Sequence, residues 1–248
     1  MPKKFQGEQN NNESILYKKT RRKRNYIIYP ILSILILFLT IHELLLQSYG
    51  EWLTPVSEEL TSDIAVVLYA NGEEPLNLAA DLLKRGKVKL IYADAIPQKR
   101  MNEFISRHNL LPDQVIWGGC VIPTTFDHAK NFKNKLEESK FSYSSILIIF
   151  KHYQLRRTEW IFRHILGPST TIKTAATKSE IERHKKYSWW NHPESRFFVS
   201  SETQKMMFYY IYYGLLHHQV SKDIEFQDAL DIEGTKYTAE QYWKIFCN

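Results

Sequence analysis

Apolar runs alternate along most of this chain with segments of helical periodicity. Short apolar runs bounded by polar residues predict strands over Asp63–Ala70, Val88–Ala93, Gln114–Trp117, Ile146–Phe150 and Thr170–Thr174. Helical spacing predicts helices over Glu74–Arg85, Pro97–Asn109, Phe126–Ser139, from the fourth strand to about Ile165, Ser200–Leu216 and Ala239–Phe246. This alternation is typical of a parallel sheet with helices on both faces. The pattern predicts an α/β fold with three layers.

A longer apolar segment precedes this region. No charged residue occurs from Ile27 to Ile41, and Tyr26–Gln47 is long enough for a helix of about 20 residues that crosses a bilayer. A cleaved signal peptide and a buried core helix are the alternatives, but Ser48-Tyr49-Gly50 matches a signal-peptidase site poorly. We therefore expect residues 26–47 to be a transmembrane anchor, and the membrane to be a partner of the chain.

The basic charge of the chain lies in its tail. Residues 1–25 hold eight Lys and Arg residues against two Glu residues, which equals the net charge of +6, so the other 25 basic and 25 acidic residues cancel. We therefore predict no nucleic-acid partner for the folded region. A basic segment before a span stays in the cytoplasm. The expected location is the plasma (inner) membrane, with a single pass and the α/β domain outside the cytoplasm.

The remaining organisation follows from composition. We expect a basic cytoplasmic tail (1–25), the anchor (26–47), a polar linker (48–61), the α/β domain (62–217) and a C-terminal extension (218–248). Cys120 and Cys247 can pair outside the cytoplasm, but we favour a buried thiol and a terminal thiol. No metal-ligand spacing occurs, and the cofactor is unknown from the sequence.

The fourth strand ends in a cluster of polar and cationic residues. Residues 146–157 read ILIIFKHYQLRR, and ligands of open α/β sheets bind at the carboxyl ends of strands. Lys151, Tyr153 and Arg157 are therefore candidate ligand-binding residues, and His152 is a candidate general acid or base. The alternative is that an Arg pairs with a surface acid such as Glu159, and that His152 is structural.

The loops after the other strands meet the same edge of a parallel sheet. Asn71 and Gly72 form a turn before a helix, Asp94 can bind a ligand hydroxyl, and Thr124 and Thr125 precede a further helix. Each has a structural alternative, which is a plain turn for Gly72 and helix capping for Asp94 and Thr125.

The motif order resembles a known family. The chain carries DIAVVLYA, AADLLKRGKVKLIYADA, TTFDHAKN, ILIIFKHYQLRRTEWIFR and WWNHPESRFFVSSETQKMMFYYIYYGL, in this order over residues 62–215. This order is similar to that of the YdcF/SanA/ElyC family, a domain of unknown function. The resemblance implies a Rossmann-like fold behind one membrane helix and a role in the cell envelope, such as barrier integrity or lipid-carrier metabolism. It also raises S-adenosylmethionine binding as a further alternative.

The resemblance covers the pocket motifs only in part. Thr125, Ala129, Tyr153 and Arg157 match the family pattern, and Asp127 is a conservative change that the resemblance makes a catalytic candidate. The chain departs from the pattern at Asn71-Gly72, Pro75, Ala93-Asp94, His128, Phe150 or Lys151, and Gln154. These departures fall in the expected pocket loops, and they indicate an altered ligand or lost chemistry.

Three hypotheses follow. The first is a membrane-anchored, outward-facing domain that binds a small anionic ligand, phosphorylated or nucleotide-like, with Asp127 or His152 moving a proton if the domain is an enzyme. The second is a degenerate, non-catalytic homologue that acts as a binding or scaffold protein in the envelope. The third is a methyl-donor-binding protein, which the missing Gly-rich turn disfavours.

Overall fold

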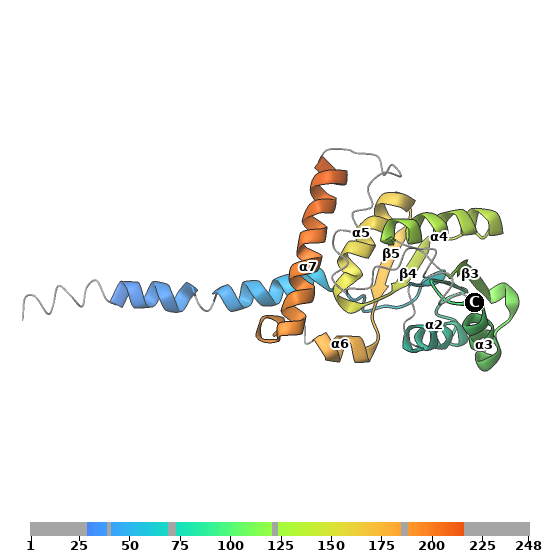
Figure 1. The fold of residues 1–248 in the computed structure, drawn as a ribbon, viewed down its shortest axis with the longest axis horizontal. Helices are drawn as coiled ribbons and strands as arrows, with labels where there is room; N and C mark the ends of the chain where they lie inside the picture. Colours follow the sequence, from blue (N-terminus) through green and yellow to red (C-terminus); the bar gives the residue numbers. More distant parts are fainter. Residues whose placement is uncertain (1–28, 39–40, 69–72, 121–123, 185–187, 216–248) are drawn as a thin grey trace, which may run out of the picture. The chain divides into compact units, whose positions relative to one another are not determined.

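A computed structural model describes residues 29–38, 41–68, 73–120, 124–184 and 188–215 (Figure 1). The chain divides into two compact units between Ser48 and Tyr49. The predicted pocket residues Asn71 and Gly72 and the whole predicted C-terminal extension, with its expected helix, lie outside the described residues.

The N-terminal helix is long and apolar enough to span a membrane. It runs from Tyr29 to Leu53 over 25 residues, and its mean hydropathy is 2.0. Those of its apolar side chains up to Leu45 that the structure describes are exposed. The prediction of one apolar helix of membrane-spanning length is confirmed. The helix extends through the first residues of the segment predicted as a polar linker.

The second unit is built on five parallel strands. They are β1 (Ile64–Val67), β2 (Leu90–Asp94), β3 (Val115–Gly119), β4 (Ser145–Ile149) and β5 (Thr171–Ala175). Their order in the sheet is β3-β2-β1-β4-β5, and every pairing is parallel. The predicted Rossmann-like α/β fold is confirmed. The order reverses between β1 and β4, and doubly wound folds bind ligands at the carboxyl end of such a switch point.

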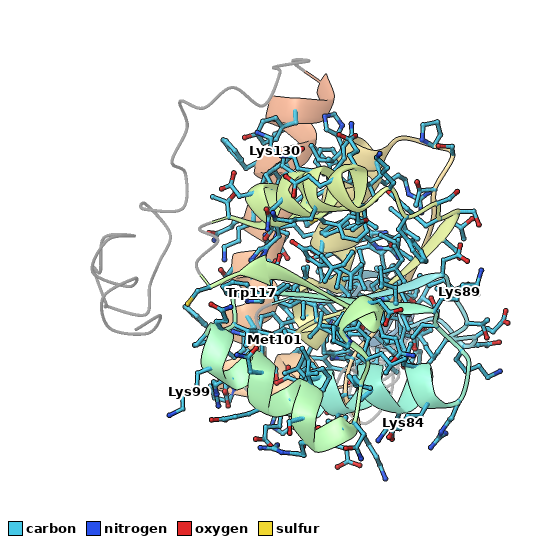
Figure 2. All side chains as sticks on the ribbon, turned by 90° about the vertical axis from the view of Figure 1, so that its right-hand side faces the viewer. Lys84, Lys89, Lys99, Met101, Trp117 and Lys130 are labelled. Carbon is cyan, nitrogen blue, oxygen red and sulfur yellow. The ribbon has the colours of Figure 1, made fainter. Side chains whose placement is uncertain are left out.

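Helices cover both faces of this sheet. The helices are α2 (Glu74–Lys84), α3 (Gln98–His108), α4 (Thr125–Ser139), α5 (Leu155–Leu166), α6 (Lys178–His184) and α7 (Pro193–Tyr209), with short turns η1 (Pro112–Gln114), η2 (His152–Gln154), η3 (Trp189–Asn191) and η4 (Tyr210–Leu215). In Figures 1 and 2, α4 and α5 lie on one side of the sheet and α2 and α3 on the other.

Alternate strand residues supply the two cores. Ile64 and Val66 of β1 pack with Phe132 and Phe162 of the α4–α5 layer. Their neighbours Ala65 and Val67 point to the opposite face and pack with α2 and α3. Because both strand faces are buried, the strands read as continuous apolar runs rather than alternating ones.

Three local predictions need correction. The cap of α4 is Thr124, whose Oγ accepts a hydrogen bond from the Asp127 N–H, and Thr125 is instead the first helical residue. The last helix begins at Pro193, a residue that suits the first turn, rather than at Ser200. The short helix α6 was not predicted. It has only seven residues, too few for a clear helical period.

Candidate functional site

A buried acid and a histidine meet at the carboxyl edge of the sheet. Asp94 is the last residue of β2 and is fully buried, and His128 lies in the first turn of α4. The Nδ1 atom of His128 is 2.8 Å from Oδ2 of Asp94, a close contact that is not aligned as a hydrogen bond. The Oδ1 atom of Asp94 makes no hydrogen bond to any described residue. The fold brings these two residues together, although 33 positions separate them in the sequence.

Tyr92 and Asn131 extend this cluster. The Tyr92 hydroxyl donates to Asp94 Oδ2 at 3.2 Å and accepts from Asn131 Nδ2 at 2.9 Å. Asn131 Nδ2 also donates to the carbonyl of Gly118 at 2.6 Å. Burial, followed by the charge of Asp94, raises the pKa of Tyr92. Tyr92 therefore stays a neutral donor that supports the Asp94 carboxylate.

Gly118 lets β3 approach this cluster closely. A Cβ atom at position 118 would collide with the Tyr92 ring and hydroxyl and with Cβ of Asp94. We expect Gly118→Ala to lower the free energy of unfolding by about 1 to 3 kcal/mol, the usual range for overpacking. Urea unfolding followed by tryptophan fluorescence measures this. A variant as stable as the wild type would show that β3 moves away without cost.

The predicted threonines and Asp127 organise the start of α4. Thr124 Oγ donates to Asp127 Oδ2 at 2.6 Å while accepting from the Asp127 N–H, so the two side chains cap the helix together. Thr125 Oγ accepts from Arg157 Nη1 at 2.8 Å. These contacts give each residue a structural role, and the predicted catalytic role of Asp127 stays a prediction.

Arg157 forms a buried ion pair with a residue that the sequence did not single out. Its Nε and Nη2 atoms donate to the two carboxylate oxygens of Glu202 in α7, at 2.7 and 3.3 Å. Only 6% of Arg157 and 1% of Glu202 are exposed. Burial opposes the charge of Arg157, but attraction and hydrogen bonding to Glu202 outweigh it and raise the pKa of Arg157. The pair joins α5 to α7. Glu202 thus balances the charge of Arg157, the residue that was predicted to bind a ligand.

The other residues of the predicted cationic cluster follow β4. Lys151 follows the end of β4 and is the residue just before η2, while His152 and Tyr153 are buried within η2. The Tyr153 ring stacks on Phe198 of α7, with centroids 4.4 Å apart. Arg156 pairs with Glu159 at 2.9 Å, which is the surface pairing that the sequence left open as an alternative.

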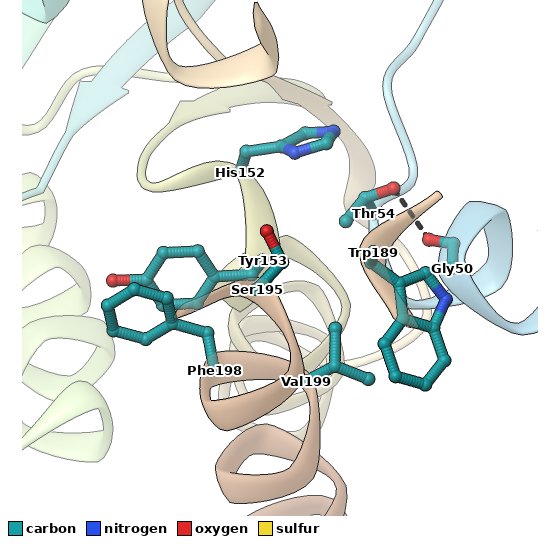
Figure 3. A pocket seen from close by; sticks show the side chains of 8 residues that line it. All are labelled: Gly50, Thr54, His152, Tyr153, Trp189, Ser195, Phe198 and Val199. Atoms are coloured by element: carbon teal, nitrogen blue, oxygen red, sulfur yellow. Dashed lines mark hydrogen bonds between the residues drawn. The ribbon is translucent and has the colours of Figure 1, made fainter. Parts of the chain in front are cut away.

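His152 and Tyr153 line a small hollow (Figure 3). Its other walls come from η3, from α7, and from the end of the N-terminal helix with the residue that follows it, namely Gly50, Thr54, Trp189, Ser195, Phe198 and Val199. The cavity volume is about 10 Å³, close to the room that one water molecule needs. A larger ligand therefore requires these walls to move apart.

The start of α2 carries acids rather than a free positive end. Glu73 pairs with Arg107 of α3 at 2.5 Å, and Glu74 accepts a hydrogen bond from Ser179 of α6. Hydrogen bonding to Arg107 and its charge lower the pKa of Glu73. These carboxylates compete with an anion for the N-terminus of α2.

Cys120 follows β3 at this edge and is disulfide-bonded. The favoured prediction of a free buried thiol is therefore wrong for Cys120. The residue is only half-buried at the sheet edge, where another cysteine can reach it. The chain has one other cysteine, Cys247, which lies outside the described residues.

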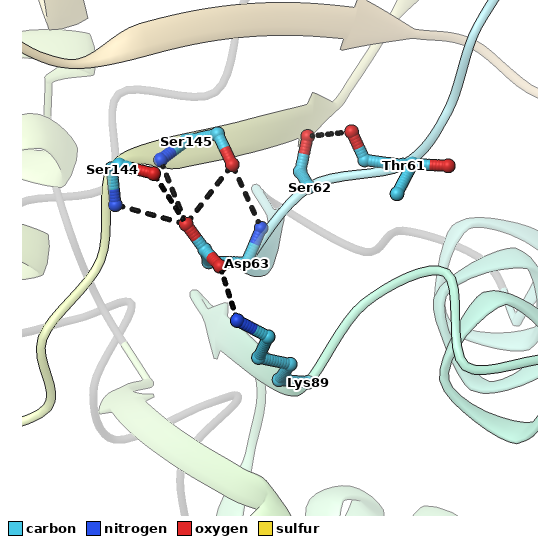
Figure 4. A network of polar contacts seen from close by, with 6 residues as sticks. All are labelled: Thr61, Ser62, Asp63, Lys89, Ser144 and Ser145. Carbon is cyan, nitrogen blue, oxygen red and sulfur yellow. Dashed lines mark hydrogen bonds and ion pairs between the residues drawn. The ribbon is translucent and has the colours of Figure 1, made fainter.

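A second polar network, centred on the carboxylate of Asp63, lies at the opposite, amino edge of the sheet (Figure 4). Asp63 Oδ2 accepts from the backbone N–H and the hydroxyl of both Ser144 and Ser145, and Oδ1 accepts from Lys89 Nζ at 2.7 Å. Asp63 thereby joins the starts of β1, β2 and β4. Because the Asp63 network lies at the edge opposite the switch point, we interpret it as structural. The Asp94 cluster is therefore the candidate site.

The sequence reasoning missed His128 as the partner of Asp94 and Glu202 as the partner of Arg157. His128 had a weak signal, because it lies three residues after Thr125, at the predicted start of a helix that follows the strand ends. Glu202 had none, because it is 45 residues from Arg157 in a helix with no clear polar stripe. Comparison with known proteins gives no match to a protein-family model and no match to a curated protein.

Proposed function

We propose that this protein is a membrane-anchored α/β domain on the outer side of the cytoplasmic membrane that binds a nucleotide-like ligand at the carboxyl edge of β1, β2 and β4. A role in cell-envelope biogenesis or barrier integrity follows from the resemblance of its motifs to the YdcF/SanA/ElyC family. The proposal is one of ligand binding and assigns no reaction.

Asp94 carries this proposal. Doubly wound nucleotide-binding folds place an acid at the end of the second strand, about 20 residues after the first turn, where it binds a ribose hydroxyl. Asp94 occupies this place beside β1. A fully buried carboxylate oxygen without a hydrogen bond is costly, and a hydroxyl donor would satisfy Oδ1.

Lys151 is the cation that we assign to the phosphate. It stands at the end of β4, on the other side of the switch point from β2. Arg157 is balanced by Glu202, and Glu73 and Glu74 occupy the start of α2. The position of Lys151 at the switch-point edge is the reason for this assignment.

Two features support the location. The basic residues before the N-terminal span favour a cytoplasmic tail, which leaves the domain outside. Disulfides such as that of Cys120 persist outside the reducing cytoplasm.

Nucleotide titration of the full-length chain in detergent micelles tests the proposal. The probes are uridine and adenosine 5′-monophosphates, and the matching nucleosides and 2′-deoxynucleotides are the controls. Calorimetry measures the affinity of each. We expect Lys151→Ala to weaken nucleotide binding by about tenfold or more, since a charge-assisted hydrogen bond contributes about 1.5 to 3 kcal/mol. Lys84→Ala, at the far end of α2, is the matched control and should bind as the wild type does.

Asp94→Asn tests the sugar contact independently of stability. The wild type should prefer the ribonucleotide over its deoxy form, and the variant should lose this preference. Equal binding of both forms by the wild type would contradict the assignment of Asp94, and unchanged affinity in Lys151→Ala would contradict that of Lys151.

A second candidate is a scaffold protein without a small-molecule ligand. The balanced charge of Arg157 and the cavity of about 10 Å³ favour it. Absence of binding by every nucleotide, together with recovery of defined partner proteins after cross-linking in intact cells, would support this alternative.

A further inference from the structure

We propose that His128 is a general base for hydrolysis of a phosphoanhydride bond in the bound ligand, and that Asp94 orients it. The inference rests on the proposed function, which places a nucleotide-like ligand at this edge of the sheet, and it adds a reaction to that binding. The substrate class is a nucleoside diphosphate or a larger nucleotide with the same anhydride bond. The reaction is transfer of a phosphoryl group to water.

The first observation is the arrangement of the His128 ring. Its Nδ1 atom is 2.8 Å from Asp94 Oδ2, and the side chains of His128 and Asp94 are 6% and 0% exposed. A carboxylate beside one ring nitrogen favours the proton on that nitrogen, which leaves the other nitrogen as a proton acceptor. The contact is not aligned as a hydrogen bond. Hydrogen bonds between catalytic groups often become aligned only when the substrate is bound.

The second observation is which of these atoms water can reach. Asp94 Oδ1 and His128 Nδ1 are sealed from solvent and make no hydrogen bond to a described residue. The Nε2 atom of His128, on the other side of the ring, also makes no hydrogen bond to a described residue, but it is not sealed from solvent. Nε2 can therefore accept a proton from a water molecule while Nδ1 faces Asp94.

The third observation is the place of this ring in the sheet. The first turn of α4 contacts β2 through His128 and contacts α5 through Thr125, whose Oγ is 2.8 Å from Arg157 Nη1. Because α5 follows β4, and β1 lies between β2 and β4, this turn extends from β2 across β1 toward β4. Doubly wound sheets bind their ligands at such a switch point. His128 therefore lies on the turn that joins the proposed ribose site at Asp94 to the side of the proposed phosphate site.

The neighbouring groups favour water as the nucleophile. The hydroxyls of Thr124 and Thr125 are hydrogen-bonded to Asp127 and Arg157. In the proposed step, His128 Nε2 takes a proton from water, the water oxygen bonds to the terminal phosphorus, and the bond from this phosphorus to the bridging oxygen breaks. The electron pair of that bond stays on the leaving phosphate, which departs as an anion and needs no acid. The proton on Nε2 then passes to solvent.

Hydrolysis of uridine and adenosine 5′-diphosphates tests the proposal in the full-length chain in detergent micelles, with Mg²⁺ present as the counter-ion of the phosphates. We expect inorganic phosphate and nucleoside monophosphate in equal amounts, measured by chromatography. His128→Gln should lower kcat by about 10²- to 10⁴-fold and leave KM unchanged, because a general base acts in the transition state. His108→Gln is the matched control, since His108 lies in α3 on the opposite face of the sheet (Figure 2). It should hydrolyse the diphosphates as the wild type does.

Rescue by added imidazole separates proton transfer from a structural role of the ring. His128→Ala leaves room for a free imidazole, which should restore hydrolysis. Pyrazole has a ring of the same size but is a much weaker base, and it should not restore hydrolysis. Equal effects of the two compounds, including no effect of either, would overturn the role of His128 as a base.

The outcomes separate the reaction from the binding. Calorimetry should show that His128→Gln binds the diphosphates as the wild type does, which also shows that the variant is folded. Binding without hydrolysis in the wild type, or equal hydrolysis by the wild type and His128→Gln, would overturn this inference and leave the ligand site standing. Absence of binding by the monophosphates and diphosphates would overturn the proposed function and this inference with it.

Discussion

Replacing Glu202 with alanine should lower the free energy of unfolding by about 3 to 5 kcal/mol, the range for removing one partner of a buried ion pair. Glu202 accepts two hydrogen bonds from Arg157, and both side chains are almost fully buried. Without Glu202, Arg157 would remain charged in the interior, beside the Thr125 hydroxyl at 2.8 Å and the Tyr209 ring at 5.9 Å. An uncompensated charge in this place costs more than the pair contributes.

Chemical denaturation of the full-length chain in detergent, followed by tryptophan fluorescence, measures the effect. Glu138→Ala is the matched control, since its pair with Lys135 is exposed and should change the stability by less than about 1 kcal/mol. Arg157→Met combined with Glu202→Leu should recover most of the loss, because it removes both charges together. A loss of less than about 1 kcal/mol in Glu202→Ala would mean that water reaches Arg157 and that the α5–α7 contact is not a buried pair.

Asp63→Ala should lower the free energy of unfolding by about 2 to 4 kcal/mol, because it removes several charge-assisted hydrogen bonds at once. Ser144 and Ser145 would lose their shared acceptor, and Lys89 its ion pair. Asp113→Ala is the control, since Asp113 is an exposed acid in η1. A variant as stable as this control would show that the starts of the strands are held by backbone pairing alone.

The contribution of Asp63 should also depend on pH. Hydrogen bonding to Lys89, followed by the Ser144 N–H, lowers the pKa of Asp63 below its ordinary value near 4. A lowered folded-state pKa stabilises the protein above the unfolded-state pKa, and this contribution decreases as the pH falls toward the folded-state pKa. The difference in stability between the wild type and Asp63→Asn should therefore be constant from about pH 5 to 7. Below about pH 4 it should shrink, by at most about 1.4 kcal/mol per pH unit. A difference that persists unchanged at pH 3 would contradict this role.

The elements of the sheet were predictable because their signal is local. Ile146–Ile149 is apolar at every position and short, as expected of a strand buried on both faces, and the helices between the strands show a helical period. The sequence predicted the ends of the helices and strands less well. Thr124 and Thr125 are adjacent and chemically equivalent as caps, and the backbone conformation of Thr124 decides between them.

The sequence predicted the edge of the sheet at which the candidate site lies, but not the contacts between its side chains. The sequence indicated the carboxyl ends of β2 and β4 because parallel strands bring their ends to one edge. It did not indicate that Arg157 would face Glu202 or that Asp94 would face His128, since each contact joins elements that are distant in the sequence.

The sequence by itself therefore determined the alternation of strands and helices and the apolar N-terminal helix, because burial imposes a hydrophobic pattern that can be read residue by residue. Tertiary structure decided which polar groups pair. A charge can be balanced by any acid that the fold brings within a few ångströms, and that distance depends on how helices pack rather than on the spacing of residues along the chain.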